Sequence, residues 1–161
     1  RKVLQGLLEQ RVAIRDLVTI LEICGDHVDL LDNVEEVTER CRVALARQIC
    51  ASVVDREGNL RVLALGPVAE QAIRESLLSG KSWGHDQVEQ LERAVRKARD
   101  EHDHPPVLIT DPPTRRLVQR WLQHSLPDLT ILSTEELVAG FKVEVAAMVE
   151  LHSAPTPSGV A

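Results

Sequence analysis

The chain is poor in aromatic residues and has no excess of positive charge. Only 2% of its 161 residues are aromatic, and tyrosine is absent. Few rings are therefore available to stack on bases or sugars. Asp and Glu number 25 against 19 Lys and Arg, which gives a formal net charge of -6. A chain with this charge lacks the positive field that holds nucleic acid, so we expect no nucleic-acid partner.

Cysteines and long apolar runs are also scarce. The three cysteines, Cys24, Cys41 and Cys50, cannot all pair, and none lies in a CxxC motif, so we expect a reducing compartment such as the cytoplasm. No run approaches the roughly 20 apolar residues that a membrane-spanning helix needs, and no basic start precedes an apolar signal segment. The sequence begins at Arg1 rather than at a methionine, and we expect it to be a soluble piece of a longer protein.

Hydrophobic residues make up 43% of the chain, enough for one moderate core or two small cores that pack together. In the first third they recur at helical spacing, which predicts short amphipathic helices within residues 3–8 and 14–24, ending near Gly25. Asn33 is expected to cap a third helix, with Glu36 completing a capping box. The inward residues are expected to be Ile14, Leu17, Val18, Leu21 and Cys24 in the second helix, and Val34, Val37, Cys41, Ala44 and Leu45 in the third.

The pattern changes at residue 49. Residues 49–54 and 60–65 are apolar runs separated by a turn-prone segment that contains Gly58, and this arrangement predicts a β-hairpin. Pro67 is expected to open a helix over residues 68–78. Another helix is expected to follow, capped by Asp86, with Val88, Leu91, Val95 and Ala98 facing inward.

The clearest organisation lies in residues 107–132. A buried strand at residues 107–110, a helix that starts at Asp111 and a strand at residues 130–132 predict a right-handed, parallel βαβ unit. Alternating residues predict a last strand over residues 141–149. We therefore predict an α+β fold, with a helical subdomain at residues 1–50, a small α/β subdomain with the hairpin and the βαβ unit at 51–152, and a flexible Pro/Ser/Gly-rich tail at 153–161.

Three stretches of the chain carry a resemblance to a known family. Residues 11–22 read RVAIRDLVTILE, residues 37–49 read VTERCRVALARQI, and residues 106–133 contain PVLI, the pair Arg115-Arg116 and LPDLTILS. All three resemble the FlhA/SctV (FHIPEP) family of bacterial type III secretion export-gate proteins. The first two are similar to helices of the family's third cytoplasmic subdomain, and the last to the close of its fourth. The resemblance covers almost all of the chain.

The resemblance implies a role in binding and assembly. In the family, the third subdomain builds the lateral contacts of a nonameric ring, and the fourth meets the coiled-coil stalk of the export ATPase. Nothing here resembles the first two subdomains, to which the resemblance assigns most docking of export chaperones. The expected location is the cytoplasmic face of the bacterial inner membrane, as the soluble part of an integral membrane protein. The wording IRDLVTILE leans towards a flagellar system, and an injectisome stays open.

Three departures from the family's pattern bear on partner specificity. Ala13 stands where the family often has Ser, Gly66 where it usually has Asp or Glu, and Thr134 where it usually has Tyr. Losing a Ser cap costs a helix about 1 kcal/mol, which a subdomain can absorb. We therefore expect these changes to affect the choice of partner more than the fold.

Four charged residues of the helical subdomain are candidates for the ring contact. They are Arg15, Asp16, Arg40 and Arg42, on helices whose other face is expected to be buried. Arginine pairs bidentately with carboxylates, and a ring of weak polar contacts can form when a membrane tether raises the local concentration. The alternative is a solvated helix face.

Arg115, Arg116 and Arg120 form a basic stripe in an otherwise acidic chain. A partner helix that carries carboxylates would fit such a stripe, and the alternative is a plain surface. With the four residues above, these three complete the candidate partner-binding set.

Enzymatic alternatives have weaker support. Residues 79–82 end like the P-loop GxxxxGK[ST], but Glu75 stands in place of its first glycine and a helix is expected before it. The acidic and histidine-rich segment at residues 100–104 offers metal ligands too close in sequence to converge on one ion. Ser125, Ser133 and His124 lack a GxSxG elbow. We expect neither catalysis nor a cofactor; a stand-alone adaptor or a small nucleotide- or metal-dependent enzyme remain the alternatives.

Overall fold

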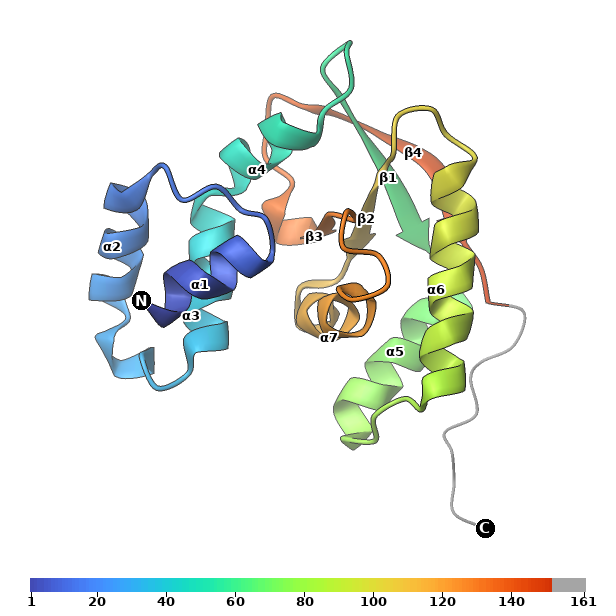
Figure 1. The fold of residues 1–161 in the computed structure, drawn as a ribbon, viewed down its shortest axis with the longest axis horizontal. Helices are drawn as coiled ribbons and strands as arrows, with labels where there is room; N and C mark the ends of the chain where they lie inside the picture. The colour runs from blue at the N-terminus through green and yellow to red at the C-terminus, as the bar shows by residue number, and fades with distance from the viewer. Residues whose placement is uncertain (152–161) are drawn as a thin grey trace.

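A computed structural model describes residues 1–151, and the predicted tail at 153–161 lies outside this range. The first part of the chain is helical (Figure 1). Its elements are α1 (Lys2–Glu9), α2 (Leu17–Asp26), the 3-10 helix η1 (Val28–Leu30), α3 (Val34–Ala44) and α4 (Ala46–Val53).

Side-chain caps set where two of these helices begin. Asp16 accepts a hydrogen bond from the backbone N–H of Thr19 at 3.1 Å and another from its hydroxyl at 2.7 Å. These bonds lower the pKa of Asp16. They also cap α2, which begins at Leu17, three residues after the start of the predicted range. Asn33 caps α3 as predicted, because its side chain accepts from the N–H of Glu36 at 3.2 Å.

The predicted hairpin is wrong, because its first strand is helical. Ile49 follows Leu45 by four positions and Cys50 follows Ala46 by four, so each pair lies one helical turn apart, and all four residues are buried. A strand would have turned one of the neighbours Ile49 and Cys50 away from the core. Short apolar runs leave helix and strand ambiguous by periodicity, and packing decides the outcome here.

A turn then leads into β1 (Asn59–Leu65). The carboxylate of Asp55 accepts from the N–H groups of Asn59 and Glu57, each at 2.9 Å, and these bonds lower its pKa. Gly58 takes a positive φ of 82°, which favours glycine. The turn was predicted correctly, although it joins a helix to a strand.

Beyond β1 the chain alternates helices and strands. The elements are α5 (Pro67–Ser79), α6 (His85–Asp100), β2 (Val107–Thr110), α7 (Pro112–Leu122), β3 (Ile131–Ser133), η2 (Thr134–Glu136) and β4 (Lys142–Val149). Pro67 opens α5 as predicted, whereas Gly84 rather than Asp86 occupies the cap of α6. The link between these helices is held by Trp83, which stacks on Trp121 with 4.5 Å between ring centroids.

The strands form a sheet in the order β3-β2-β1-β4, and each neighbouring pair is parallel. The βαβ unit β2-α7-β3 is confirmed as parallel. β1, which was expected to pair in a hairpin, instead lies in the centre between β2 and β4. The fold class is therefore α+β as predicted, with a different role for β1.

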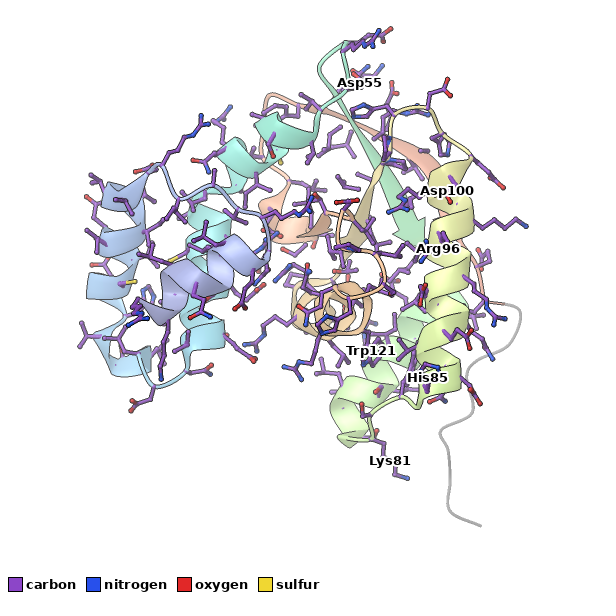
Figure 2. The ribbon with its side chains drawn as sticks, viewed as in Figure 1. Asp55, Lys81, His85, Arg96, Asp100 and Trp121 are labelled. Carbon is purple, nitrogen blue, oxygen red and sulfur yellow. The ribbon has the colours of Figure 1, made fainter. Side chains whose placement is uncertain are left out.

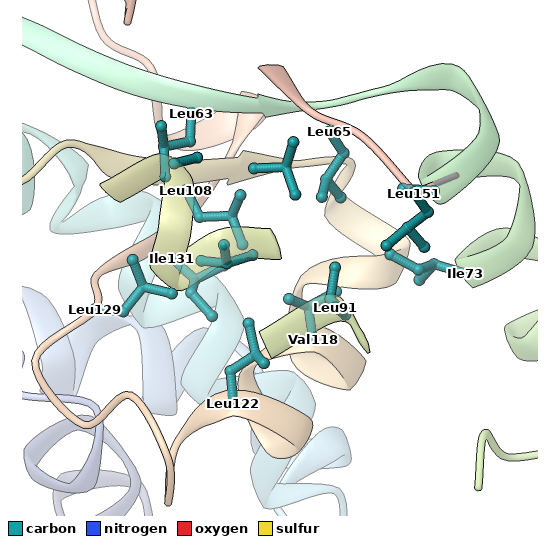
Figure 3. Close-up of a cluster of buried hydrophobic side chains, with 14 of the residues drawn as sticks. Leu63, Leu65, Ile73, Leu91, Leu108, Val118, Leu122, Leu129, Ile131 and Leu151 are labelled. Carbon is teal, nitrogen blue, oxygen red and sulfur yellow. The ribbon is translucent and has the colours of Figure 1, made fainter. Parts of the chain in front are cut away.

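Each face of the sheet supports its own core. Helices α5, α6 and α7 cover one face, where Leu63 and Leu65 of β1 point (Figure 3). Leu60 and Val62 point to the other face and pack with α1, α3 and α4. Helices and sheet therefore share a core across the expected boundary at residue 50, which falls inside α4.

The last strand is confirmed, but its apolar residues are less buried than their alternation suggests. Val143 and Val145 lie opposite the buried Leu60 and Val62 of β1, yet Val145 is 63% exposed. β4 is an edge strand of the sheet, and Val143 and Val145 are not part of the core on this face. A register shift then turns Val149 inward, where it is buried.

Candidate functional site

Arg42 is buried, which corrects the expectation that it lies on an outer helix face. Its side chain is 2% exposed, and its Nε lies 2.8 Å from Oε1 of Glu136, a residue of the α/β subdomain. Nη1 donates to Oε1 of Gln10 at 3.2 Å, and Nη2 donates to the carbonyl of Ile131 at 3.1 Å. Burial, reinforced by the neighbouring positive charge of Arg115, lowers the pKa of Arg42. Arg42 thus contacts its own chain.

Arg115 is also buried rather than part of an exposed stripe. It is 0% exposed and forms a bidentate pair with Glu39 of α3, in which Nε donates to Oε2 at 2.7 Å. Nη2 donates to Oε1 of Gln10 at 2.8 Å, and Nη1 donates to the carbonyl of Ile131 at 3.3 Å. Gln10 and Ile131 therefore accept from both arginines. We call the buried arginine network Gln10, Glu39, Arg42, Arg115, Glu136 and the carbonyl of Ile131.

Arg116 and Arg120 lie at the edge of this network and remain partly exposed. Arg120 approaches Glu35 of α3 at 3.3 Å, and Arg116 lies 3.8 Å from Glu35 and 3.9 Å from Glu36. A groove of about 290 Å³ between α1, α3 and α7 runs over them. The acidic helix that suits the basic stripe is thus present in the chain itself, as α3.

The other predicted contact residues lie near α2 and on α3. Asp16 caps α2, and Arg15 immediately before it is exposed. Arg40 is exposed on α3, where it pairs with Glu36 at 3.2 Å and contacts His27 at 3.1 Å. Glu36 also lies 3.9 Å from Arg116, so Arg40 is beside the exposed edge of the buried arginine network, and only Arg15 and Asp16 lie elsewhere, at the start of α2.

Sequence reasoning missed an apolar surface on α2. Within α2, which the structure describes in full, only Ile20 is buried. Val18 and Leu21, predicted to face inward, are 67% and 66% exposed, because α2 is the outermost helix and contacts the molecule through α3 (Figure 1). Six of the ten residues of α2 are apolar, more than one neighbouring helix can cover, and this excess was the available signal. We call the apolar α2 surface the exposed Leu17, Val18 and Leu21 of α2, together with the exposed Val28 and Leu31 of the segment that follows it.

A second apolar area lies at the other end of the molecule. A groove of about 630 Å³ runs between α6 and the outer strand β4. Alanines at positions 94, 98 and 147 and the side chains of Met148 and Leu151 line it, together with charged residues of α6 that include Lys97.

The segments considered for catalysis lie in different parts of the fold. Residues 79–82 follow a helix and end at a loop where Lys81 points away from the molecule (Figure 2). His104 contacts the carbonyl of Val53 at 3.4 Å, and Ser133 is a buried strand residue. Among residues 1–151 the structure contains no group of three His, Cys, Asp or Glu side chains able to hold a metal ion.

The cysteines are free, with Cys41 and Cys50 buried. Burial raises the pKa of Cys41 to about 12 and also raises the pKa of Cys50. Both therefore remain protonated, unreactive thiols at neutral pH. In the part of the chain that the structure describes, no helix is both long and apolar enough to cross a membrane.

Comparisons with known proteins agree on one family. Residues 1–142 match the model of the FHIPEP family. The flagellar biosynthesis protein FlhA of Bacillus subtilis is 31% identical over 159 residues, which cover 94% of this chain and 24% of that protein. The chain thus spans about a quarter of the length of this curated relative.

Solved structures give the same result for the fold. The nonameric SctV-C of EPEC is 26% identical, has a TM-score of 0.75, and is matched over 91% of this chain and 46% of that one. CdsV of Chlamydia pneumoniae, solved in a complex with CdsO, is 21% identical with a TM-score of 0.73, over 92% of this chain and 46% of that one.

Proposed function

The chain belongs to the FHIPEP family, and from that premise we propose that it is part of the cytoplasmic platform of a bacterial type III export gate. It acts there by binding and assembly rather than by catalysis, and needs no cofactor. The observation that carries the proposal is the apolar α2 surface, exposed on a domain whose fold matches a nonameric relative. The proposed location is the cytoplasmic face of the inner membrane, in a flagellar or an injectisome system.

In this proposal the apolar α2 surface forms the lateral contact between neighbouring copies. Exposed leucines and valines lose water-accessible area when a neighbour covers them, which favours association. Arg15 and Arg40 lie on the same subdomain and are exposed, so they add polar contacts at the rim. A contact between two different surfaces repeats around a ring until it closes. Because the area is small, the contact needs the high local density that a membrane provides.

A stalk protein of the export ATPase is the second proposed partner, on the α/β subdomain. The complex of CdsV with CdsO supports a partner of this kind for a related fold. Arg116 and Arg120 are the proposed contacts, because their ion pairs with Glu35 and Glu36 are long and exposed. Carboxylates of a partner helix can take the place of Glu35 and Glu36 at little cost in free energy. Export chaperones are proposed to bind parts of the family's cytoplasmic region that this chain does not resemble.

Assembly on vesicles tests the ring proposal. The 161-residue chain, attached through a terminal histidine tag to nickel-bearing lipid vesicles, is expected to form rings visible by electron microscopy while remaining a monomer at micromolar concentration in solution. Changing Val18→Ser together with Leu21→Ser should raise the surface density needed for assembly at least tenfold. Leu78→Ser is the matched control and should leave this surface density unchanged. Leu78 is also exposed, at 80%, but it lies on α5 rather than on the apolar α2 surface.

Two outcomes would contradict the proposal. A stable dimer in light scattering would show an isologous contact that does not build a ring. Measurable binding of ATP with Mg²⁺, or of Zn²⁺, in calorimetry would instead favour the enzymatic alternative.

A further inference from the structure

The buried arginine network joins the helical elements to the α/β elements in a reciprocal way. Arg42 extends from α3 to Glu136 of η2, at 2.8 Å. Arg115 extends in the opposite direction, from α7 to Glu39 of α3, with a 2.7 Å bond. Each side of the junction therefore contributes one arginine and one glutamate, and each ion pair crosses the junction.

The two shared acceptors tie each arginine to both sides. Gln10, which follows α1, accepts from Arg42 at 3.2 Å and from Arg115 at 2.8 Å. The carbonyl of Ile131, in β3, accepts from the same two residues at 3.1 and 3.3 Å. A guanidinium is planar, with its donors in a fixed fork. Rotating one side against the other would break bonds of both forks at once.

Glu136 is fixed independently of Arg42. Its Oε2 accepts the backbone N–H of Ser133 at 2.7 Å, in the capping box that starts η2. Its carbonyl accepts from the thiol of Cys50 in α4 at 3.2 Å. The carboxylate that forms the ion pair with Arg42 is therefore held in place by its own turn and by a helix from across the junction, as a preorganised partner should be.

The buried arginine network contributes more to the relative orientation of the two subdomains than to the free energy that holds them together. Apolar residues of α1, α3 and α4 already pack on the sheet, and apolar burial is non-directional. Buried ion pairs cost desolvation, and apolar residues of similar volume often replace them with little loss of stability. What such a replacement cannot reproduce is the fixed geometry of two crossed forks.

We propose that Arg42 and Arg115 are positioning residues that fix the angle between the helical and the α/β subdomains. In a ring, which rests on the proposed function, every copy would then present its α/β subdomain in one orientation. The angle itself is a property of the single chain, so it can be measured where no ring forms.

Electron-electron double resonance measures this angle as a distance distribution. Spin labels at Val18→Cys in α2 and Leu78→Cys in α5 report on the two subdomains, because both positions are well exposed. Cys24→Ala removes the partly exposed native thiol, while Cys41 and Cys50 are buried. We expect a narrow distribution in this background, and at least a twofold broader one after the paired change Arg42→Met and Glu136→Leu.

The controls separate orientation from folding. Arg115→Lys is the second variant, for use if the paired variant does not fold. It keeps the positive charge but loses the planar fork of donors, and it should also broaden the distance distribution. Arg93→Gln should change nothing, because Arg93 pairs with Glu89 on the same helix. An unchanged width in a folded network variant would overturn the inference. Rings that fail to form from an unaltered chain would instead overturn the proposed function and leave this inference standing.

Discussion

The helical and the α/β parts of the molecule differ in how completely they bury their apolar residues. In α6, Leu91, Val95 and Ala98 are buried between the sheet and the neighbouring helices. In α2, only Ile20 is buried, and the large residues Val18 and Leu21 are exposed. Helix α6 therefore completes its apolar packing within a single copy, whereas α2 leaves apolar area exposed. Exposed apolar residues of the α/β part, such as Leu78 and Val145, lie outside α6.

The largest effect is expected where the two parts meet. Glu136→Leu alone would leave the buried Arg42 without its charged partner, and breaking one side of a buried pair costs about 3 to 5 kcal/mol. We expect urea unfolding monitored by circular dichroism to show that loss in one transition covering both parts. Two separate transitions would mean that the parts fold independently. Arg93→Gln, an exposed pair within α6, should stay within about 0.5 kcal/mol of the original.

Leucine-to-alanine substitutions in α6 and in α2 are expected to differ in cost. Leu91→Ala in α6 should cost about 2 to 5 kcal/mol, because Leu91 is fully buried. Leu21→Ala in α2 should cost less than about 0.5 kcal/mol, because Leu21 is largely exposed. Thermal unfolding of both variants checks the pair. Equal losses would mean that the apolar α2 surface is covered in solution.

A smaller effect is expected at the start of α3. Asn33→Ala removes the acceptor for the N–H of Glu36 and should cost about 1 kcal/mol. Asn33→Asp keeps an acceptor and should restore most of that loss, as measured by chemical denaturation. If alanine and aspartate behave alike, the bond contributes nothing to stability.

The smallest effect is a pH dependence of α2. The hydrogen bonds from Thr19 lower the pKa of Asp16 below its ordinary value of 3.8. Their contribution is therefore complete above pH 3.8 and disappears as the pH falls through the lowered pKa. The NMR shift of the Thr19 amide should follow this titration, and Asp16→Asn should abolish it. A Thr19 shift that titrates equally in both proteins would exclude Asp16 as the cause.

Many elements of the fold could be predicted from residues that are close together in the sequence. Local sequence predicted the start of α3 at Asn33, the start of α5 at Pro67 and the βαβ unit of residues 107–133. Helix caps, prolines and buried strands can each be recognised from neighbouring residues. The hairpin was not, because the pairing of β1 with β2 and β4 depends on residues far along the chain. Periodicity alone could not decide whether residues 49–53 form a strand or a helix.

The candidate contacts divided for a similar reason. A charged residue in a sequence is expected on the surface, because burying it unpaired is costly. Arg42 and Arg115 are buried because Glu136 and Glu39 approach from elements distant in sequence. Arg15 and Arg40 are exposed, and Arg40 forms its ion pair with Glu36 of the same helix. The ring contact of Arg15 and Arg40 and the stalk contact of Arg116 and Arg120 remain predictions.

The parallel pairing of β1 with β4 has a consequence for synthesis on the ribosome. Leu65 of the central strand pairs with Val149, so β1 keeps one open edge until almost all of the described chain has emerged. Closing so long a loop is slow, and such non-local pairing delays folding. A nascent chain that stalls before residue 142 would expose the edge of an apolar strand and would be prone to aggregation. Completion of the sheet therefore depends on the last described strand.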